Sequence, residues 1–344
     1  MANLKVDTVS GIGTEGPVLN GGLHFRSENY LTLPKGTTTQ RISTSSGIST
    51  VIGAIRYNTD SNKMECYVND KWMIVSTSSP NLDGGGRGVA AGGNTPAATD
   101  TIEFITISTQ GNSIDFGNLT ATRQSQPGAT GSSTRGVIGG GQDGGSPTTL
   151  NIIDFITFSS TGNASDFGDL TAARRQPAVT GSQTRGLFSG GGPSVVNTMD
   201  YVTIASTGDA VDFGDLSVAR KGAGAASSPN RSLIVGGVSP GDVNTIDYVT
   251  TSTLGNAQDF GDTTQAKYNL GVVSSSTRAV IMGGYRSSPG AGVNTIEYVT
   301  IATIGNAMEF GDLTEATYAA QSASDSIRGV RMGGVTPLDT SCDY

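Results

Sequence analysis

Five near copies of one 19-residue segment limit what this chain can fold into more than any other feature. Residues 244–262 read NTIDYVTTSTLGNAQDFGD, and close variants begin at residues 100, 151, 197 and 294. An Arg followed by a Gly-Gly pair recurs with steps of 48, 50, 46, 47 and 50 residues. This second marker occurs at Arg87, Arg135, Arg185, Arg231, Arg278 and Arg328. A period of this length predicts a propeller or a solenoid, with one supersecondary unit per repeat.

Each complete repeat carries the signals of four short antiparallel strands. The IDYVTTST-type segment is rich in β-branched and aromatic residues, and TGN, TGD or a close variant supplies the turn that ends it. A second aromatic residue follows the first by 12 positions. The pairs are Phe104 and Phe116, Phe155 and Phe167, Tyr201 and Phe213, Tyr248 and Phe260, and Tyr298 and Phe310. The other two strands are expected just before the Arg and from the Arg to the Gly-Gly pair, which predicts the blade of a β-propeller.

The pattern within these strands favours sheets that are stacked face to face. Both alternating sets of the NTID strand contain apolar residues, as expected when both faces of a strand are buried. The Gly-Gly pair is expected where two backbones approach closely. The repeated Arg is expected to have a structural role, with its guanidinium bonded to carbonyl groups or to an Asp of a neighbouring sheet.

The stretch RGVIGGG, followed by NIIDFITFSSTGNASDFGDL, resembles the kelch repeat, with a Gly-Gly after a strand and two aromatic residues around a hairpin. Phe stands where kelch units usually carry Trp at the second aromatic position. This variety of repeat is similar to those in structural proteins of marine tailed phages, especially phages of cyanobacteria. The resemblance implies an all-β fold: a six-bladed kelch-like β-propeller over residues 71–344, preceded by a small β-rich attachment or oligomerisation module over residues 1–70.

The two ends of the repeat array are incomplete. The first repeat lacks a repeat-type strand before Arg87, and we expect residues 71–79, KWMIVSTSS, to supply it. The last repeat stops at Tyr344, so its sheet is expected either to have three strands or to borrow an outer strand from the N-terminal region. Cys342 is expected to be a small core residue, with a disulfide to Cys66 as the weaker alternative.

The first eighty residues do not repeat. IRYNTDSNKMECYV predicts a hairpin, and ND predicts a second turn that leads into KWMIV. LTLPKGTTTQR together with GAIRYNTDSNKMECYVNDKW resembles a small module of phage fibres and appendages. That resemblance implies attachment to other virion proteins and self-association, with a trimer expected. A plain β-rich cap on the propeller is the alternative.

Composition argues against several functional classes. The chain of 344 residues has a net charge of −8 and no basic cluster, so nucleic-acid binding is not expected. No apolar run is long enough for membrane insertion. One histidine, His24, leaves no Ser-His-Asp set and no zinc spacing, so we expect neither an enzyme nor a cofactor. The repeated pairs Asp166/Asp169, Asp212/Asp215 and Asp259/Asp262 suggest either calcium ligands or, preferably, turn residues whose carboxylates accept backbone N–H groups.

The residues that depart from the repeat gather between each Gly-Gly pair and the next strand. Equivalent loops of antiparallel blades emerge at one end, where insertions commonly mark a binding face. Neutral drift of unconstrained loops is the alternative interpretation. The candidate receptor-binding residues are Gln142, Asp143, Ser194, Asp242, Tyr285, Arg286 and Asp339.

These observations favour a non-enzymatic phage virion protein, such as a fibre or appendage, whose propeller adheres to a host-surface glycan or protein. Binding would be weak at each site and strengthened by several copies. The first alternative is a capsid or tail decoration protein that uses the propeller as a spacer or docking platform. A glycan depolymerase with paired carboxylates ranks lower, because no acid pair stands out from the repeat.

Overall fold

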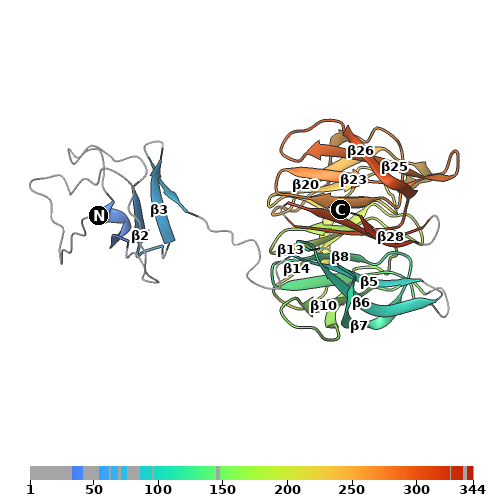
Figure 1. The fold of residues 1–344 in the computed structure, drawn as a ribbon, viewed down its shortest axis with the longest axis horizontal. Coiled ribbons are helices and arrows are strands. Elements are labelled where there is room, and N and C mark those ends of the chain that lie inside the picture. Colours follow the sequence, from blue (N-terminus) through green and yellow to red (C-terminus); the bar gives the residue numbers. More distant parts are fainter. Residues whose placement is uncertain are drawn as a thin grey trace, which may run out of the picture. The chain divides into compact units, whose positions relative to one another are not determined.

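The computed structural model describes residues 33–41, 54–61, 63–68, 71–75, 86–94, 97–109, 111–144, 148–325, 327–335 and 339–343. The chain divides into two compact units, Met1–Ser78 and Ser79–Tyr344 (Figure 1). Among the described residues, every regular element is a β-strand except the 3-10 turn η1 (Thr38–Gln40). The expected all-β class, with several antiparallel sheets, is therefore confirmed.

The N-terminal unit contains one four-stranded sheet in the order β1-β2-β3-β4. Its strands are β1 (Lys35–Gly36), β2 (Ile55–Asn58), β3 (Lys63–Val68) and β4 (Lys71–Ile74). Both expected hairpins are confirmed, because β2 pairs with β3 and β3 pairs with β4, each antiparallel. The expectation that residues 71–79 form the inner strand of the first repeat is wrong, because β4 completes this sheet instead. The division between the units accordingly falls after Ser78.

The described residues of the second unit form six main antiparallel sheets, which we number in chain order. The first sheet comprises β5 (Arg87–Asn94), β6 (Ala98–Thr106) and β7 (Ile114–Arg123). The second comprises β8 (Gly128–Gly131), β9 (Arg135–Gly139), β10 (Ile152–Thr157) and β11 (Ser165–Asp169). The third comprises β12 (Ala178–Gly181), β13 (Arg185–Ser189), β14 (Thr198–Thr203) and β15 (Val211–Asp215).

The later sheets repeat this order with small additions. The fourth comprises β16 (Gly224–Ser227), β17 (Arg231–Val235), β20 (Thr245–Thr250) and β21 (Gln258–Asp262), with a hairpin of β18 (Val238–Ser239) and β19 (Gly241–Asp242). The fifth comprises β22 (Gly271–Ser274), β23 (Arg278–Met282), β25 (Ala291–Thr300) and β26 (Met308–Thr317), and β24 (Tyr285–Arg286) adds to β25. The sixth comprises β27 (Gln321–Ser324), β28 (Gly329–Gly334) and β29 (Asp339–Asp343).

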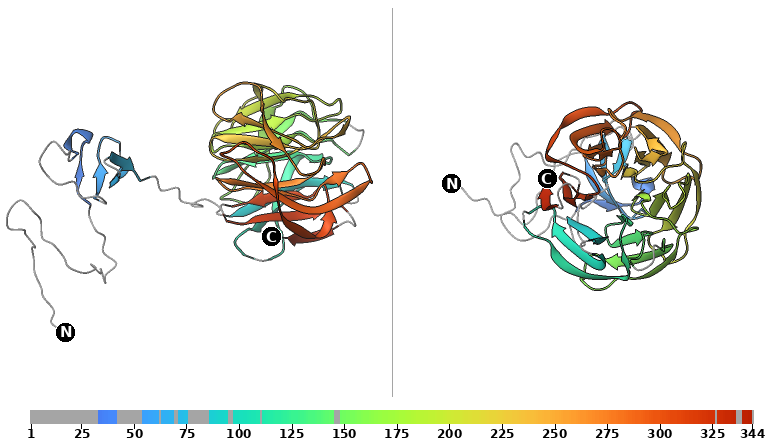
Figure 2. Two further views of the ribbon diagram at one scale, coloured as in Figure 1. Left: turned by 90° about the horizontal axis from the view of Figure 1, so that it is seen from above. Right: turned by 90° about the vertical axis from the view of Figure 1, so that its right-hand side faces the viewer.

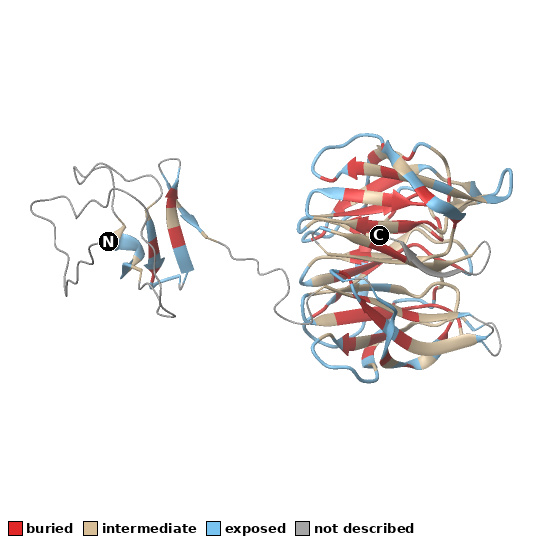
Figure 3. Ribbon diagram, in the orientation of Figure 1, coloured by how far each residue is buried: buried red, intermediate tan, exposed pale blue. Residues whose placement is uncertain are grey.

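Neighbouring sheets pack face to face, and the sixth packs against the first. Strands β8, β12, β16, β22 and β27 lie in succession, each in contact with the next, and β27 contacts β5 (Figure 2). The core consists of apolar clusters between sheets rather than one central core (Figure 3). Ile105 and Ile107 of the first sheet and Val330 of the sixth form one such cluster. Ile246 and Asp247, which are consecutive in β20, are both fully buried, as expected for a strand covered on both faces.

The repeated Arg side chains connect successive sheets through backbone carbonyl groups. Arg135 donates to the Ile204 carbonyl of the third sheet at 3.0 Å. Arg328 of the sixth sheet donates to the Ile107 carbonyl of the first sheet at 3.1 Å. Five of these guanidinium groups also lie over the first aromatic ring of their own repeat, at 4.3–4.7 Å from the ring centroid. The expected structural role of this Arg is confirmed.

The Gly-Gly pairs lie where the backbone of the next connection passes closely. Gly190 has φ +63°, and a Cβ on it would lie 2.3 Å from the carbonyl oxygen of Arg220. The next residue, Gly191, donates its N–H to that same carbonyl at 2.9 Å. Any side chain at Gly190 would therefore displace the connection that leads from the third sheet to the fourth, and the expected close backbone approach at this pair is confirmed.

The outer edge of each of the first four sheets is joined to the turn of the following sheet. Gly214 of β15 has φ +141°, and a Cβ there would lie 2.5 Å from the carbonyl oxygen of Gly255. Gly255 donates its N–H to the Phe213 carbonyl at 2.9 Å, and Asn256 Oδ1 accepts the Asp215 N–H at 3.0 Å. The repeated DFGD and TGN segments are thus the two halves of one contact between sheets.

A buried ion pair spans each of four interfaces between successive sheets. In every pair the basic residue lies where the chain leaves one sheet, and the acidic residue lies in the third strand of the next sheet. The pairs are Arg123 and Asp154 at 2.7 Å, Arg174 and Asp200 at 2.8 Å, Arg220 and Asp247 at 2.8 Å, and Lys267 and Glu297 at 3.2 Å. Burial lowers the pKa of the Lys267 ammonium, and the attraction of Glu297 opposes that change. In the fourth pair, Lys replaces Arg and Glu replaces Asp. The charges are the same, and the longer acidic side chain compensates for the shorter basic one.

The first and sixth sheets each have three strands in the described residues. Among the described residues, no strand pairs with the inner edge of β5, and the Gln321 side chain bonds to that edge. Gln321 Oε1 accepts the Ala91 N–H, and Gln321 Nε2 donates to the Ala91 carbonyl, both at 3.2 Å. These two bonds mimic a strand pairing at the junction of the last and first sheets.

The contact between Gly214 and Gly255 provides a matched pair of substitutions. We expect Gly214→Ala to lower the free energy of unfolding by about 1–3 kcal/mol more than Gly255→Ala does. Both residues have φ near +145°, but only a Cβ at Gly214 meets backbone, whereas nothing lies within 4 Å of one at Gly255. Chemical denaturation of both variants measures the difference. Equal losses would contradict the proposed close approach of the sheets.

The ion pairs provide a second test. Asp247→Ala leaves the fully buried Arg220 guanidinium without its counter-charge, so we expect a loss of about 3–5 kcal/mol in the free energy of unfolding. Asp259 lies opposite Asp247 in the strand register and is exposed, so Asp259→Ala is the matched control, with an expected change within about 0.5 kcal/mol. Thermal and chemical unfolding of both variants measure this. A small effect of Asp247→Ala would show that the pair is dispensable.

Candidate receptor-binding end

The connections that follow the Gly-Gly pairs lie at one end of the sheets, which we call the Gly-Gly end. In each of sheets two to six, the residue after the Gly-Gly pair forms a single β-bridge with the residue that enters that sheet. The bridges are Gln124 with Gln142, Arg175 with Gly192, Lys221 with Val238, Tyr268 with Tyr285, and Tyr318 with Val335. The chain enters the first sheet at Arg87, which is at the opposite end of β5 from its Gly-Gly pair.

Gln142 and Asp143 use their polar groups within the unit. Gln142 is only 5% exposed, and its Oε1 accepts a hydrogen bond from Arg175 at 2.7 Å and one from the Ser125 hydroxyl at 3.2 Å. Asp143 is half-buried, and its Oδ1 accepts the Thr148 N–H at 3.3 Å. Gln142 therefore braces the second sheet against the entrance of the third, whereas Asp143 fixes the connection to which it belongs.

Ser194 and Asp242 differ in their surroundings. Ser194 lies in an exposed turn between β13 and β14. Asp242 Oδ2 accepts the Ser287 N–H at 2.7 Å, and its Oδ1 accepts the Ser287 hydroxyl at 2.6 Å. Asp242 therefore joins the connections of the fourth and fifth sheets.

Tyr285 belongs to a cluster of three tyrosine rings, whereas Arg286 has no charged partner. Tyr285 lies 5.4 Å from Tyr268 and 4.8 Å from Tyr318 between ring centroids, both edge to face. Arg286 is half-buried, and among the described residues it forms no ion pair. Of the predicted residues, Tyr285 stands out because it links the fifth and sixth sheets.

Asp339 begins β29 and pairs with Gly334 in the backbone register; its side chain lies outside the described residues. The structure thus brings Asp242 close to the connection that contains Arg286, and places Gln142 beside the third sheet. No described contact joins Ser194 to the other predicted residues.

Sequence reasoning missed the entry residues, which we define as Gln124, Arg175, Lys221, Tyr268 and Tyr318. All five are half-buried, and each bridges to the residue after a Gly-Gly pair. The sequence did contain a signal for them: the five occupy equivalent positions of the repeat and yet are of different types. They directly follow Arg123, Arg174, Arg220, Lys267 and Thr317. They lie outside the loops of variable length, in which departures from the repeat had predicted the binding residues.

The repeated acidic pairs do not have the role preferred from the sequence. Asp166 and Asp169 lie in strand β11 rather than in a turn. The carboxylate that accepts a backbone N–H at this interface is that of Asp209, at 3.0 Å from the Asp169 nitrogen. No group of three or more His, Cys, Asp or Glu side chains that could hold a metal ion occurs among the described residues. His24 lies outside them.

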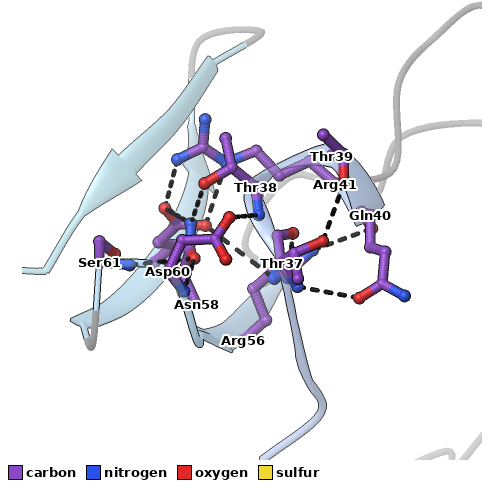
Figure 4. Close-up of polar contacts among 10 residues, drawn as sticks. Thr37, Thr38, Thr39, Gln40, Arg41, Arg56, Asn58, Asp60 and Ser61 are labelled. Atoms are coloured by element: carbon purple, nitrogen blue, oxygen red, sulfur yellow. Dashed lines mark hydrogen bonds and ion pairs between the residues drawn. The ribbon is translucent and has the colours of Figure 1, made fainter.

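The sheet of the N-terminal unit has a polar buried face. Glu65 is fully buried and accepts hydrogen bonds from Arg41 and from Asn58, the latter at 2.8 Å. Arg56 donates to the Gln40 and Thr37 carbonyl groups, both at 2.9 Å, which fixes η1 against the sheet (Figure 4). These bonds tie residues far apart in the sequence, and no pattern in the sequence had indicated them.

The opposite face of this small sheet is apolar and exposed. The strand registers align Ile55 with Cys66 and Cys66 with Met73, and Tyr57 with Met64, so these side chains share one face. Ile55 is 47% exposed and Met73 is 53% exposed. Cys66 carries a free thiol, and the side chain of Cys342 lies outside the described residues, so the disulfide between them stays a prediction. An apolar surface of this kind is suited to contact with another protein surface.

Comparison with known proteins gives no identification: no protein-family model matches the chain, and no curated protein does. The one helical turn that the structure describes, Thr38–Gln40, has neither the length nor the apolar character that a membrane crossing requires.

The buried carboxylate of Glu65 makes the N-terminal sheet sensitive to acid. The hydrogen bond from Arg41 is the main cause that lowers the pKa of Glu65. Its contribution to stability is therefore complete above the unfolded pKa of about 4.3 and is lost as the pH falls through the lower folded pKa. Trp72, the only tryptophan, lies in β4 and reports unfolding of this unit by fluorescence.

We expect acid unfolding of the wild-type N-terminal sheet below about pH 4 and a weaker acid dependence in Glu65→Gln, which cannot titrate. The substitution also removes the charge partner of Arg41, so this variant is expected to be less stable at neutral pH. Identical pH profiles for the two proteins would contradict this account of Glu65.

Proposed function

We propose that this chain is a non-enzymatic structural protein of a tailed-phage virion, a fibre or appendage, whose second unit is a six-bladed kelch-like β-propeller that adheres to a host surface. Three observations support the propeller: six main sheets with the sixth packed against the first, Arg contacts between successive sheets at five of the six junctions, and the four-strand pattern of the repeats. The phage assignment rests on the resemblance of the repeats and of the N-terminal module.

The observation that carries adhesion is the difference between the two ends of the sheets. At the Gly-Gly end, the connections vary in length, and equivalent positions carry different polar, cationic and aromatic residues. At the other end, the Ser hydroxyl and the Arg backbone form the same tight turn in sheets two to five, as at Ser132 and Arg135 or Ser182 and Arg185. Variation confined to one end of a conserved frame is typical of a binding face.

The N-terminal unit supplies the proposed attachment. Its exposed apolar face, formed by Ile55, Tyr57, Met64 and Met73, would contact other virion proteins or further copies of this chain. We propose a trimer, which would present three propellers and strengthen weak binding at each one. Sedimentation of the full chain tests this part, with a mass three times 35.0 kDa expected and a monomer contradicting it.

Adhesion is tested by incubating the purified full chain with the surface polysaccharide of candidate host cells. We expect the protein to be retained on the polysaccharide while the length of the polysaccharide chains is unchanged. Shortened chains would instead identify a depolymerase. Absence of retention on every candidate surface, with the protein folded, would favour a decoration protein whose propeller is a spacer or docking platform.

A further inference from the structure

The entry residues form a contiguous row across four sheets at the Gly-Gly end. A Cβ placed on Gly192 would lie 3.3 Å from Lys221 Cδ and 3.9 Å from Arg175 Nε, so these two cationic side chains flank one point. A Cβ placed on Gly222 would lie 3.5 Å from the Tyr268 ring. The Tyr268 ring contacts Tyr285, which in turn contacts Tyr318. Two cations are thus followed directly by three aromatic rings.

A chain of four backbone hydrogen bonds holds this row in place. The bonds join the residues that directly follow the entry residues. In each bond, the N–H of one such residue donates to the carbonyl of the corresponding residue one repeat earlier. The bonds are Gln176 to Ser125 at 3.2 Å, Gly222 to Gln176 at 3.1 Å, Asn269 to Gly222 at 2.7 Å, and Ala319 to Asn269 at 2.8 Å. All five residues have φ between +52° and +63°, a conformation that non-glycine residues keep only where the surroundings fix it.

The two cations lack an anion. Arg175 donates through one guanidinium nitrogen to the neutral Gln142 amide oxygen, and its Nε is buried without a hydrogen-bond partner. Neither Arg175 nor Lys221 forms an ion pair with any described residue. The preceding residues Arg174 and Arg220 are each paired with a buried Asp. Two adjacent positive charges repel each other, so an anion placed between them would be favoured.

The tyrosine rings offer a flat surface beside these charges. Tyr268, Tyr285 and Tyr318 are all half-buried, so each ring is anchored by its neighbours and still partly open to solvent. A half-exposed Tyr combines an apolar face with a polar hydroxyl, which suits contact with a sugar ring. The Asn269 side chain lies beside the same ring, because its Oδ1 is 2.6 Å from the position that a Cβ on Gly222 would take.

We propose that Arg175, Lys221, Tyr268, Tyr285 and Tyr318 form a binding site for an acidic polysaccharide. Arg175 and Lys221 bind a carboxylate or sulfate of the saccharide, and an adjacent sugar ring lies against the tyrosines. This inference rests on the proposed adhesion and names the chemical class of its receptor. Sulfate and carboxylate groups share the recognising chemistry, so the experiment separates them.

The test uses the full chain and three immobilised polymers: alginate, which carries carboxylates, dextran sulfate, and uncharged dextran. We expect binding to at least one of the two anionic polymers and none to dextran. Arg175→Gln/Lys221→Gln is expected to weaken binding by about tenfold or more, because two charge-assisted contacts are lost. Tyr268→Ala is expected to weaken it to a smaller degree.

Lys63→Gln/Lys71→Gln is the matched control, because it removes the same charge from exposed positions of the N-terminal sheet. It should bind like the wild type, and circular dichroism should show that every variant is folded. Equal weakening in both double variants would mean general charge attraction and would overturn the site. Equal binding to dextran, or no binding to either anionic polymer, would also overturn it.

These outcomes are distinct from failure of the proposed function. If the protein is retained on a host surface but ignores both anionic polymers, adhesion stands and this site is wrong. If Arg175→Gln/Lys221→Gln alone loses binding to an anionic polymer but no host surface retains the wild type, the site stands and the adhesion proposal is wrong.

Discussion

The close contact between one sheet and the connection that leads to the next governs the structure of the second unit. In each of the first four sheets, the Gly-Gly pair meets the carbonyl of the basic residue that leads out of the same sheet, as Gly190 and Gly191 meet Arg220. The side chain of that residue then enters the interface with the next sheet and pairs with a buried acid, as Arg220 pairs with Asp247. Backbone proximity and charge pairing depend on each other, because a side chain at the Gly-Gly pair would displace the backbone that carries the cation.

This arrangement explains which residues stay the same from one repeat to the next and which differ. The DFGD segment must keep its Gly, because the turn of the next sheet lies against it, as Gly255 lies against Gly214. The Asp of the NTID strand must keep its charge, because a buried cation faces it. The entry residues are joined to the frame by equivalent backbone bridges, while their side chains differ from one repeat to the next, so any binding function would be built there.

Much of the fold could be predicted from the sequence, because a repeated pattern averages out local uncertainty. The strands, the role of Arg135 and its equivalents, and the close approach at the Gly-Gly pairs followed from spacing and residue type. The assignment of KWMIV to the first repeat was wrong. The serine-rich residues after it resemble an inner strand of the repeat, but β4 pairs with Glu65–Val68 of β3. No local pattern in the sequence indicated that pairing. The ion pairs were missed because Arg123 and Asp154 are 31 residues apart and meet only when two sheets stack. The entry residues were missed because only loops of variable length were compared.

The most direct test of the stacked arrangement is a crosslink between its first and last sheets. A Cβ on Gly88 would lie 2.9 Å from the Cβ of Ala323, which is 235 positions later in the chain. In a background of Cys66→Ser and Cys342→Ser, the pair Gly88→Cys/Ala323→Cys should form an intramolecular disulfide after a small local shift, because bonded cysteines have Cβ atoms about 3.5–4.5 Å apart. The account predicts nearly complete crosslinking within the monomer, measured by peptide mass after digestion. Two free thiols under oxidising conditions, in a folded protein, would contradict it.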